Sequence, residues 1–219
     1  MSKNLETIVF EPGKFKKELK GFGALLKSKS DLSETGDIQP FFEKSKQLSA
    51  YLGTFSADIG PATELAFQFP FFGDFTADLI LGNKKAGEFC VVEFEDGCQD
   101  SLFKKQPSRG NPEWSSRFEH GFSQLIDWFC SLDDCKGTKG FSRTFGFGHV
   151  RFIGLLIIGR SASLDDAKRS RLKGRTEKVL IDSHPINCIT FDELHSLLQN
   201  RFILYEAASK RERRPNTGT

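Results

Sequence analysis

The chain has 219 residues, a length that fits one domain with an appendage, and its 38% hydrophobic content with 23 phenylalanines is ample for a core. The formal net charge of +2 is too small to establish a nucleic-acid partner, so such a partner has to be argued from local clusters. The five cysteines include no C-x-x-C pair and the four histidines show no paired ligand spacing, which indicates reduced thiols in a cytosol rather than disulfides or a zinc site.

The first 60 residues predict a short strand near residues 7–10 and a helix that opens at Pro40 and carries Phe41, Phe42, Leu48 and Leu52. Proline is favoured at the first position of a helix. We identify no chemistry in this part of the chain. Residues 63–96 then predict three successive strands, the first over residues 64–69 and ended by Pro70.

Three acids lie inside the second and third of these strands. Asp78 interrupts the apolar run 75–81, Glu93 and Glu95 share one face of the run 90–95, and residues 82–87 supply the turn between the runs. If the loop centres between Lys85 and Ala86, Asp78 lies directly opposite Glu93. Opposed residues have Cβ atoms roughly 5 Å apart, so the three carboxylates would converge on one spot, where their mutual repulsion would raise at least one pKa unless a cation intervenes.

A hard cation is therefore the natural occupant, and Mg²⁺ or Mn²⁺ prefers carboxylate oxygen and water. The alternative is that Glu93 and Glu95 lie on the solvated face of an antiparallel sheet. Aspartate is depleted in strands, and Asp78 sits in a run otherwise suited to a core, so we favour the metal site.

A polar loop over residues 97–112, too polar for the core and able to contact a substrate, precedes a predicted helix over residues 113–132. In that helix Gln124 falls on a different side from the apolar positions. The aliphatic run 152–158 is far too short to span a bilayer, so the sequence predicts a soluble, cytoplasmic protein.

The remaining elements predicted in chain order are a strand over residues 150–158, a basic helix over 164–173, short strands over 179–181 and 186–189, and a helix over 191–204 capped by Thr190 with Glu193. Strands mixed with helices predict an α/β fold with a mixed sheet. We expect an N-terminal extension over residues 1–60, a main domain over 61–204 and a basic, disordered tail over 205–219.

Basic residues cluster in the predicted helix near residue 170: Lys168, Arg171 and Arg175 recur at i, i+3 and i+7, with Arg169 and Lys173 on either side. This group can neutralise DNA phosphates without reading sequence. A solvated helix face is the alternative. Lys104, Lys105 and Arg109 in the polar loop are weaker candidates, and Trp114 and Trp128 either stack on bases or pack against the sheet.

An acid in one strand, E-x-E in the next and a following helix with glutamine together resemble the PD-(D/E)xK nuclease core, and the chain is more specifically similar to the Shedu anti-phage nuclease family. The residues that carry the resemblance are 72–75 with Asp78, 91–95, Trp114, 117–122, 124–128, 157–160, Arg169, 171–172, Arg175 and 190–194. The resemblance implies a PD-(D/E)xK fold with a mixed sheet flanked by helices, metal-dependent cleavage of DNA, a homo-oligomer (dimer or tetramer) and a role in defence.

The resemblance also implies residue roles. Asp78 and Glu93 take the positions of the metal-binding acids, Gln124 that of the helix glutamine, and Glu95 stands where lysine is commoner. We expect Asp78, Glu93 and the Phe94 carbonyl to hold Mg²⁺, and Glu95 to take a proton from the attacking water or bind a second cation. Gln124 would steady the water or an acid, or merely hydrogen-bond the sheet.

Two other functions remain open. The first is a catalytically silent DNA-end sensor or oligomeric scaffold, in which the missing lysine marks lost chemistry. The second is a phosphohydrolase acting on nucleotides, which we rank last because the sequence lacks a Gly-x-x-x-x-Gly-Lys phosphate loop.

Overall fold

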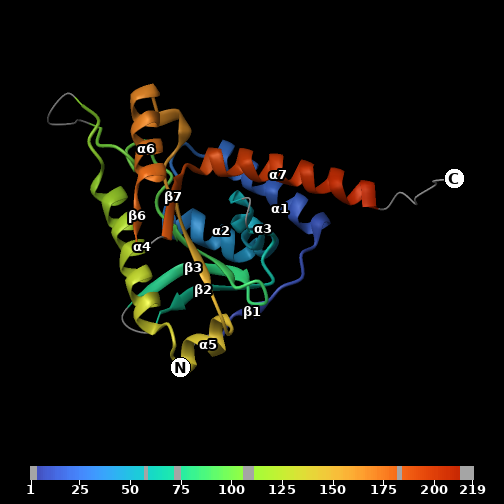
Figure 1. Ribbon diagram of the computed structural model, residues 1–219. Helices are drawn as coiled ribbons and strands as arrows, with labels where there is room; N and C mark the ends of the chain where they lie inside the picture. Colours follow the sequence, from blue (N-terminus) through green and yellow to red (C-terminus); the bar gives the residue numbers. More distant parts are fainter. Residues whose placement is uncertain (1–3, 57–58, 72–74, 106–110, 182–183, 213–219) are drawn as a thin grey trace.

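The computed structural model describes residues 4–56, 59–71, 75–105, 111–181 and 184–212 (Figure 1). Within these residues the chain forms one seven-stranded sheet in the order β1-β2-β3-β4-β5-β7-β6. The strands are β1 (Glu6–Thr7), β2 (Glu64–Pro70), β3 (Thr76–Asn83), β4 (Glu88–Phe94), β5 (Arg151–Ile157), β6 (Leu180–Ile181) and β7 (His184–Ile189). Strands β4, β5 and β7 run parallel, and the other pairs are antiparallel. The sheet is therefore mixed, as the sequence predicts.

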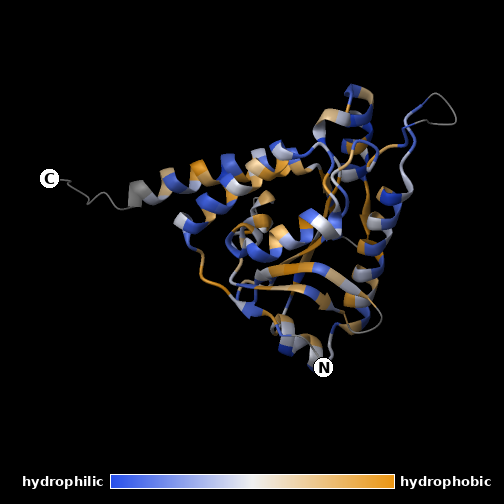
Figure 2. Ribbon diagram, turned by 180° about the vertical axis from the view of Figure 1, so that it is seen from behind, coloured by the Kyte–Doolittle hydropathy of each residue, from blue (hydrophilic) through white to orange (hydrophobic). Residues whose placement is uncertain are grey.

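Helices cover both faces of this sheet (Figure 1). On one face lie α1 (Pro12–Ser28), α2 (Gln39–Lys44), α3 (Lys46–Tyr51) and α7 (Phe191–Glu212). On the other lie α4 (Ser116–Cys135), α5 (Lys139–Phe145) and α6 (Asp166–Lys178). The strands between them are mainly hydrophobic (Figure 2), as expected for a sheet buried on both sides. The predicted α/β fold with a mixed sheet flanked by helices is confirmed.

The β3–β4 hairpin has the predicted register. Its pairs run from Leu79↔Val92 to Asn83↔Glu88, which centres the loop between Lys85 and Ala86. The Asn83 side chain accepts hydrogen bonds from the backbone N–H groups of both loop residues, at 3.0 and 3.1 Å. Gly87 closes the turn with φ +69°, a conformation that favours glycine. The local turn chemistry therefore fixes which residues of the two strands face each other.

Several elements differ from the sequence prediction. The strand near residues 7–10 is only Glu6–Thr7, and α1 and α5 were not predicted. The single helix expected from Pro40 is two, because Ser45 adopts φ −101° and ψ 59° between α2 and α3. Three further short helices are a π-helix (Glu34–Ile38) and the 3-10 turns Leu52–Phe55 and Ser161–Ser163.

Other elements follow the prediction more closely. Helix α7 begins at Phe191 with the predicted capping box, in which Glu193 accepts from the Thr190 backbone N–H at 3.0 Å and donates its own N–H to the Thr190 hydroxyl at 3.2 Å. It continues to Glu212, well beyond the predicted end at residue 204. All five cysteines are free. No helix in the described part of the chain has both the length and the apolar content needed to cross a bilayer.

The loop after β4 was predicted to be too polar for the core, and this is wrong for its first part. Leu102 and Phe103 are 1% and 3% exposed and belong to the core that contains α4. Two apolar residues in an otherwise polar segment are enough to anchor it. Arg109 lies outside the described residues, as do residues 72–74 of the sequence resemblance.

Candidate functional site

Two of the three acids singled out in the sequence, Asp78 and Glu93, meet near the start of β3 and the end of β4. Continuing the hairpin register from Leu79↔Val92 sets Asp78 opposite Glu93, and the two side chains share a hydrogen bond. Asp78 Oδ2 accepts from the Phe94 backbone N–H at 2.9 Å. The predicted opposition of Asp78 and Glu93 is therefore present, whereas the predicted convergence of all three carboxylates on one spot is not found among the described residues.

Asp78 is also held from the other side. Its Oδ1 accepts from the side-chain amide of Gln68 at 3.0 Å and from that of Gln39 at 2.9 Å. Gln68 lies between the paired positions Phe67↔Leu79 and Phe69↔Ala77, and so opposes Asp78 on β2. Its φ of +46° is the single positive value among the described residues other than glycine. Strained backbone of this kind gathers at functional sites, where surrounding structure holds it in place.

Glu93 and Glu95 do not lie on a solvated face, since they are 5% and 3% exposed. Helix α4 packs closely on Glu95: a Cβ atom on Gly121 would lie 3.1 Å from Glu95 Cγ and 2.8 Å from Leu156 Cδ1, so glycine at this position favours the close approach. The alternative prediction, two glutamates in contact with water, is wrong. Burying carboxylates is unfavourable unless they are protonated or paired.

The electrostatics of the site follow from this burial. Burial raises the pKa of Asp78 despite its hydrogen bonds to Phe94, Gln68 and Gln39. Burial first, and then the charge and hydrogen bond of Asp78, raise the pKa of Glu93 to about 11. Burial, and then the charge of Glu34, raise the pKa of Glu95 to about 7. Without a cation the site therefore keeps protons on carboxyl groups at neutral pH.

Two further acids, Glu34 and Asp96, were missed in the sequence. The backbone N–H of Glu34 donates to Asp96 Oδ1 at 2.7 Å, and Gln39 Nε2 bonds both Glu34 Oε1, at 3.0 Å, and Asp78. Burial and the charges of Asp78 and Asp96 raise the pKa of Glu34 to about 7. Asp96 directly follows Glu95, so its position in the sequence could have indicated a role at the site. Glu34 is distant in sequence, and no local pattern points to it.

Arg117 was likewise not assigned a role from the sequence. Its guanidinium lies 3.3 Å from Glu95 Oε2 and 3.0 Å from Asp96 Oδ2. Within the part of the chain that the structure describes, no other cation forms an ion pair with these acids. It stands four residues before Gly121 and seven before Gln124, a spacing that sets all three on one side of α4.

Gln124 is partly buried on α4, and its Oε1 is buried with no hydrogen-bond partner among the described residues. A buried amide oxygen without a partner is unfavourable, so it marks a position where a water or a bound group would be stabilising. Among the described residues, this oxygen accepts no hydrogen bond from a carboxyl group of the site.

The donors at the site are all oxygen atoms, which suits Mg²⁺ or Mn²⁺ rather than a softer metal. In the arrangement of the described residues, no three Asp, Glu, His or Cys side chains form a group able to hold a metal ion together. Mg²⁺ commonly takes one or two carboxylates and completes its coordination with water and substrate oxygen. The Asp78–Glu93 pair with the Phe94 carbonyl fits that requirement, since a cation would replace the shared proton.

The five cations of the predicted basic helix lie on α6, which extends to Lys178 as their spacing requires. Arg175 lies 3.1 Å from Glu119 and 4.4 Å above the Phe122 ring, and Arg171 lies 5.5 Å above Trp114. These two arginines therefore contact α4 and the segment before it. The other three have contacts of their own: Arg169 with Glu193, Lys173 with Glu177, and Lys168 with the Ser163 carbonyl.

The remaining candidates are divided between surface and core. Lys104 pairs with Glu113 at 3.0 Å, and Lys105 is exposed. Trp128 is 1% exposed and packs on Phe71. Trp114 stacks between Phe103 and Phe118, with ring centroids 4.4 and 4.2 Å away. Both tryptophans therefore pack against other side chains of the protein, which is the second of the two predicted alternatives.

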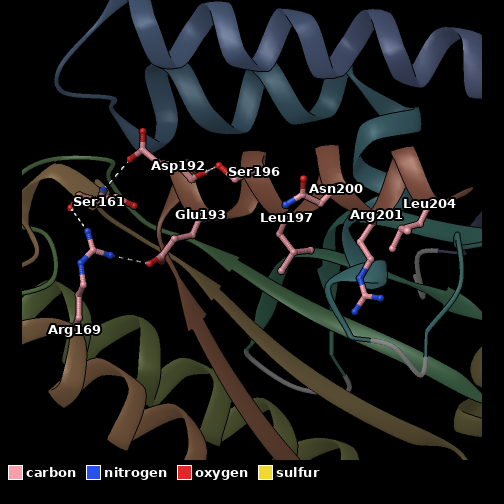
Figure 3. Close-up of a pocket in the computed structure, with 9 residues that line it drawn as sticks. All are labelled: Ser161, Arg169, Asp192, Glu193, Ser196, Leu197, Asn200, Arg201 and Leu204. Carbon is pink, nitrogen blue, oxygen red and sulfur yellow. Dashed lines mark hydrogen bonds and ion pairs between the residues drawn. The ribbon is translucent and has the colours of Figure 1, made fainter. Parts of the chain in front are cut away.

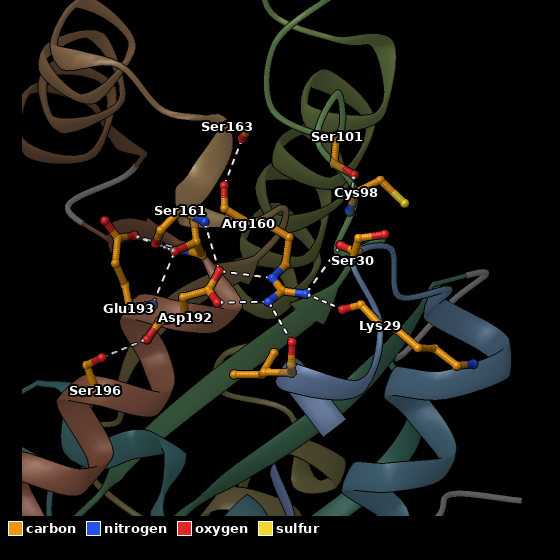
Figure 4. A network of polar contacts seen from close by, with 12 residues as sticks. Lys29, Ser30, Cys98, Ser101, Arg160, Ser161, Ser163, Asp192, Glu193 and Ser196 are labelled. Atoms are coloured by element: carbon orange, nitrogen blue, oxygen red, sulfur yellow. Dashed lines mark hydrogen bonds and ion pairs between the residues drawn. The ribbon is translucent and has the colours of Figure 1, made fainter. Parts of the chain in front are cut away.

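A separate groove of about 620 Å³ lies between α7 and the start of α6 (Figure 3). Its polar side chains bond one another: Arg169 donates to Glu193 and to the Ser161 carbonyl, and Asp192 accepts from the Ser161 backbone N–H. Beside it, Arg160 binds Asp192 through two nitrogens at 3.0 Å and also donates to the carbonyls of Leu26, Lys29 and Ser30 (Figure 4). These contacts join α1, β5 and α7 and have a structural role.

The fold and the site define an α/β protein with a mixed sheet and a buried group of carboxylates where its central strands end. The chain belongs to the Shedu family, because the family model described as Shedu protein SduA, C-terminal, matches residues 31–195. That span begins three residues before Glu34 and includes every acid of the site. Membership of this family indicates a role in anti-phage defence. No curated protein matches the chain.

Proposed function

We propose that this protein is a Mg²⁺- or Mn²⁺-dependent DNA endonuclease or nickase of anti-phage defence, built on a PD-(D/E)xK core. The observation that carries the proposal is the burial of Asp78 opposite Glu93 on two adjacent strands, with Glu95 buried two residues further along the chain. A fold has little reason to bury acids that repel one another unless they act on a cation. Perturbed carboxyl groups of this kind are typical of active sites.

Each residue has a chemical task in this proposal. Asp78, Glu93 and the Phe94 carbonyl would hold the cation, which would supply Lewis acidity and a lower pKa for a water molecule bound to it. Glu95 receives the proton of the water that attacks the phosphorus in line, the new P–O bond forms as the bond to the leaving oxygen breaks, and solvent protonates that oxygen. The unpartnered Oε1 of Gln124 accepts a hydrogen bond from the attacking water.

The partners follow from the same proposal. DNA phosphates bind five cations of α6, Lys168, Arg169, Arg171, Lys173 and Arg175. Four of these exchange a carboxylate or carbonyl partner for phosphate, and Arg171 binds phosphate from its place over the Trp114 ring. Lys104 and Lys105, in the loop before α4, add to this contact. This contact is largely independent of sequence and weakens with salt. We also propose that the active form is a cytoplasmic homo-oligomer, a dimer or tetramer.

The first test measures the unfolding temperature of the protein with Mg²⁺ or Mn²⁺ against EDTA, and then cleavage of linear and supercoiled plasmid DNA. A cation that binds only the folded state raises the unfolding temperature. We expect Glu93→Gln to lose both this rise and cleavage. Glu88→Gln is the matched control, because Glu88 stands at the opposite end of the same strand and pairs with Asn83. Equal loss in both variants, or no rise in the parent at millimolar metal, would contradict the proposal.

The second candidate function is a catalytically silent DNA sensor or scaffold of the same fold. The observation in its favour is Glu95 at the position where lysine is commoner. The two functions differ in one measurement: the silent protein would bind DNA and leave it uncut with either metal, on linear and supercoiled substrates alike.

A further inference from the structure

The acids at the end of β4 have a single counter-charge in the described chain. Arg117 contacts Glu95 and Asp96 at 3.3 and 3.0 Å, and it comes from a different element, the first turn of α4. A nuclease site that places carboxylates beside a DNA phosphate needs a positive group in addition to the metal, because the phosphate brings further negative charge. Glu95 itself cannot supply that charge.

The start of α4 is fixed firmly enough to place this arginine. Ser115 caps the helix by accepting from the Phe118 N–H at 2.9 Å, and Trp114 stacks on both Phe103 and Phe118. Gly121 then brings the helix within contact of Glu95. Helix and strand therefore hold Arg117 and Glu95 in one geometry before any DNA is bound, and preorganised charge is the kind that stabilises a transition state.

Glu95 and Arg117 differ in the solvent exposure of their side chains. The Glu95 side chain is 3% exposed and that of Arg117 is 44% exposed. The acid is thus covered, while nearly half of the arginine surface remains open to an incoming ligand. A guanidinium carries five N–H donors in a planar fork that matches phosphate oxygens, so it can keep its carboxylate contacts and still bind a phosphate.

We propose that Arg117 is a catalytic residue that supplies, from α4, the positive charge that the E-x-E motif lacks. It binds a non-bridging oxygen of the phosphate under attack and orients Glu95 through the ion pair. This inference rests on the proposed nuclease function and deepens it. The competing explanation is that the ion pair only attaches α4 to β4.

The test compares Arg117→Met, which keeps most of the apolar stem, with Arg117→Lys and with Arg143→Met on α5, an exposed arginine distant in sequence from the site. Removing one donor that stabilises transition-state charge lowers rates by about 10²–10³-fold. We expect Arg117→Met to lose about 10²-fold in kcat with little change in KM for plasmid DNA. Arg117→Lys recovers part of the loss, and Arg143→Met cuts like the parent.

Two further readouts separate chemistry from support of the fold. The rise of unfolding temperature with Mg²⁺ should persist in Arg117→Met, since the Asp78–Glu93 pair is intact. Added guanidinium at non-denaturing concentration should restore cleavage by Arg117→Ala. Cleavage by Arg117→Met at the parental rate would overturn the inference, as would a loss that neither lysine nor guanidinium restores. If the parent neither binds Mg²⁺ nor cuts DNA, the nuclease proposal itself fails and this inference with it.

Discussion

Two polar regions of this molecule, the buried acid group around Asp78 and the part-buried network around Arg160, are built on opposite principles. In the Arg160 network every guanidinium nitrogen has an acceptor, and Asp192 takes two of those bonds. Burial would raise the pKa of Asp192, but the bonds from Arg160 and the Ser161 N–H hold it below its ordinary range. In the acid group, carboxylates face carboxylates and their pKa values rise.

This contrast distinguishes buried polar groups that stabilise the fold from buried polar groups that have a function. A fully paired network stabilises one arrangement of α1, β5 and α7. A group of mutually repelling acids destabilises the metal-free protein and becomes favourable only when a cation binds. The two regions should therefore respond in opposite ways to substitution, to pH and to metal.

The largest effect is expected where the paired network is broken. Arg160→Leu removes the donor to the carbonyls of Leu26 and Lys29 and two of the hydrogen bonds to the Asp192 carboxylate. Removing one member of a fully buried ion pair costs about 3–5 kcal/mol, and this pair, whose side chains are 13% and 33% exposed, should lose less, about 2–3 kcal/mol. The measurement is the free energy of unfolding in urea. Arg169→Leu is the comparison, because its pair with Glu193 is 46% and 40% exposed, and such surface pairs contribute about 0–1 kcal/mol. Similar losses in both variants would contradict the structural role assigned to Arg160.

A smaller effect is expected from pH in the metal-free protein. Burial raises the pKa values of Glu34 and Glu95 from 4.5 to about 7, so the folded state binds more protons than the unfolded state between these values. A raised pKa stabilises the folded state below about pH 4.5 relative to above 7, and that contribution is lost as pH rises through this window.

The unfolding temperature in EDTA should therefore fall between pH 5 and pH 8, and saturating Mg²⁺ at pH 8 should reverse part of the fall. Replacing Glu34 and Glu95 together by glutamine should make the profile shallower, while Glu93, whose pKa is also raised, keeps part of the slope. A profile as steep as that of the parent would show that other groups cause the pH dependence.

No loss of stability is expected when Glu93 becomes glutamine in the absence of metal. Burial and Asp78 raise the pKa of Glu93 to about 11, so at pH 7 the folded side chain is a neutral carboxyl that glutamine mimics in shape. The unfolded parent gains free energy by ionising this carboxyl above about pH 4.5, which glutamine cannot do, so the free energy of unfolding of Glu93→Gln in EDTA at pH 7 should equal or exceed that of the parent. Asp192→Asn, which removes the charge from the Arg160 pair, should lose stability. A loss for Glu93→Gln would place Glu93 with the paired network instead.

The acid hairpin was predictable because its information is local. Asp78, Glu93 and the turn residues lie within one short stretch, and side-chain alternation with the turn centre fixes their faces and register. Helix α1 was also within reach, since Pro12 opens it and Phe15, Leu19, Phe22 and Leu26 recur at helical spacing, all buried. That spacing was overlooked.

The rest of the site could not be predicted from the sequence because it depends on tertiary contacts. Glu34 bonds Asp96, which is 62 positions away, and Gln39 bonds Asp78, 39 positions away. No periodicity reports such pairs. In the sequence, Arg117 is simply another cation near the start of a helix. Its contacts with Glu95 and Asp96 exist only because α4 packs against the end of β4. Likewise, only the fold shows that Arg175 lies over Phe122 while Lys173 points away from such contacts.

This last difference gives the smallest predicted effect on stability and the cleanest test of the proposed DNA contact. Lys173 is 72% exposed and pairs with Glu177 at 3.8 Å, so Lys173→Ala should leave the free energy of unfolding nearly unchanged. If α6 binds DNA phosphates, the same variant should weaken binding to all sequences and reduce the slope of log affinity against log salt by about 1. Arg175→Ala is the contrasting variant, because it also removes packing on Phe122 and the pair with Glu119, and should lower stability. An unchanged salt slope for Lys173→Ala would mean that this exposed cation serves solubility alone, and that the α6 contact must be assigned to other residues or abandoned.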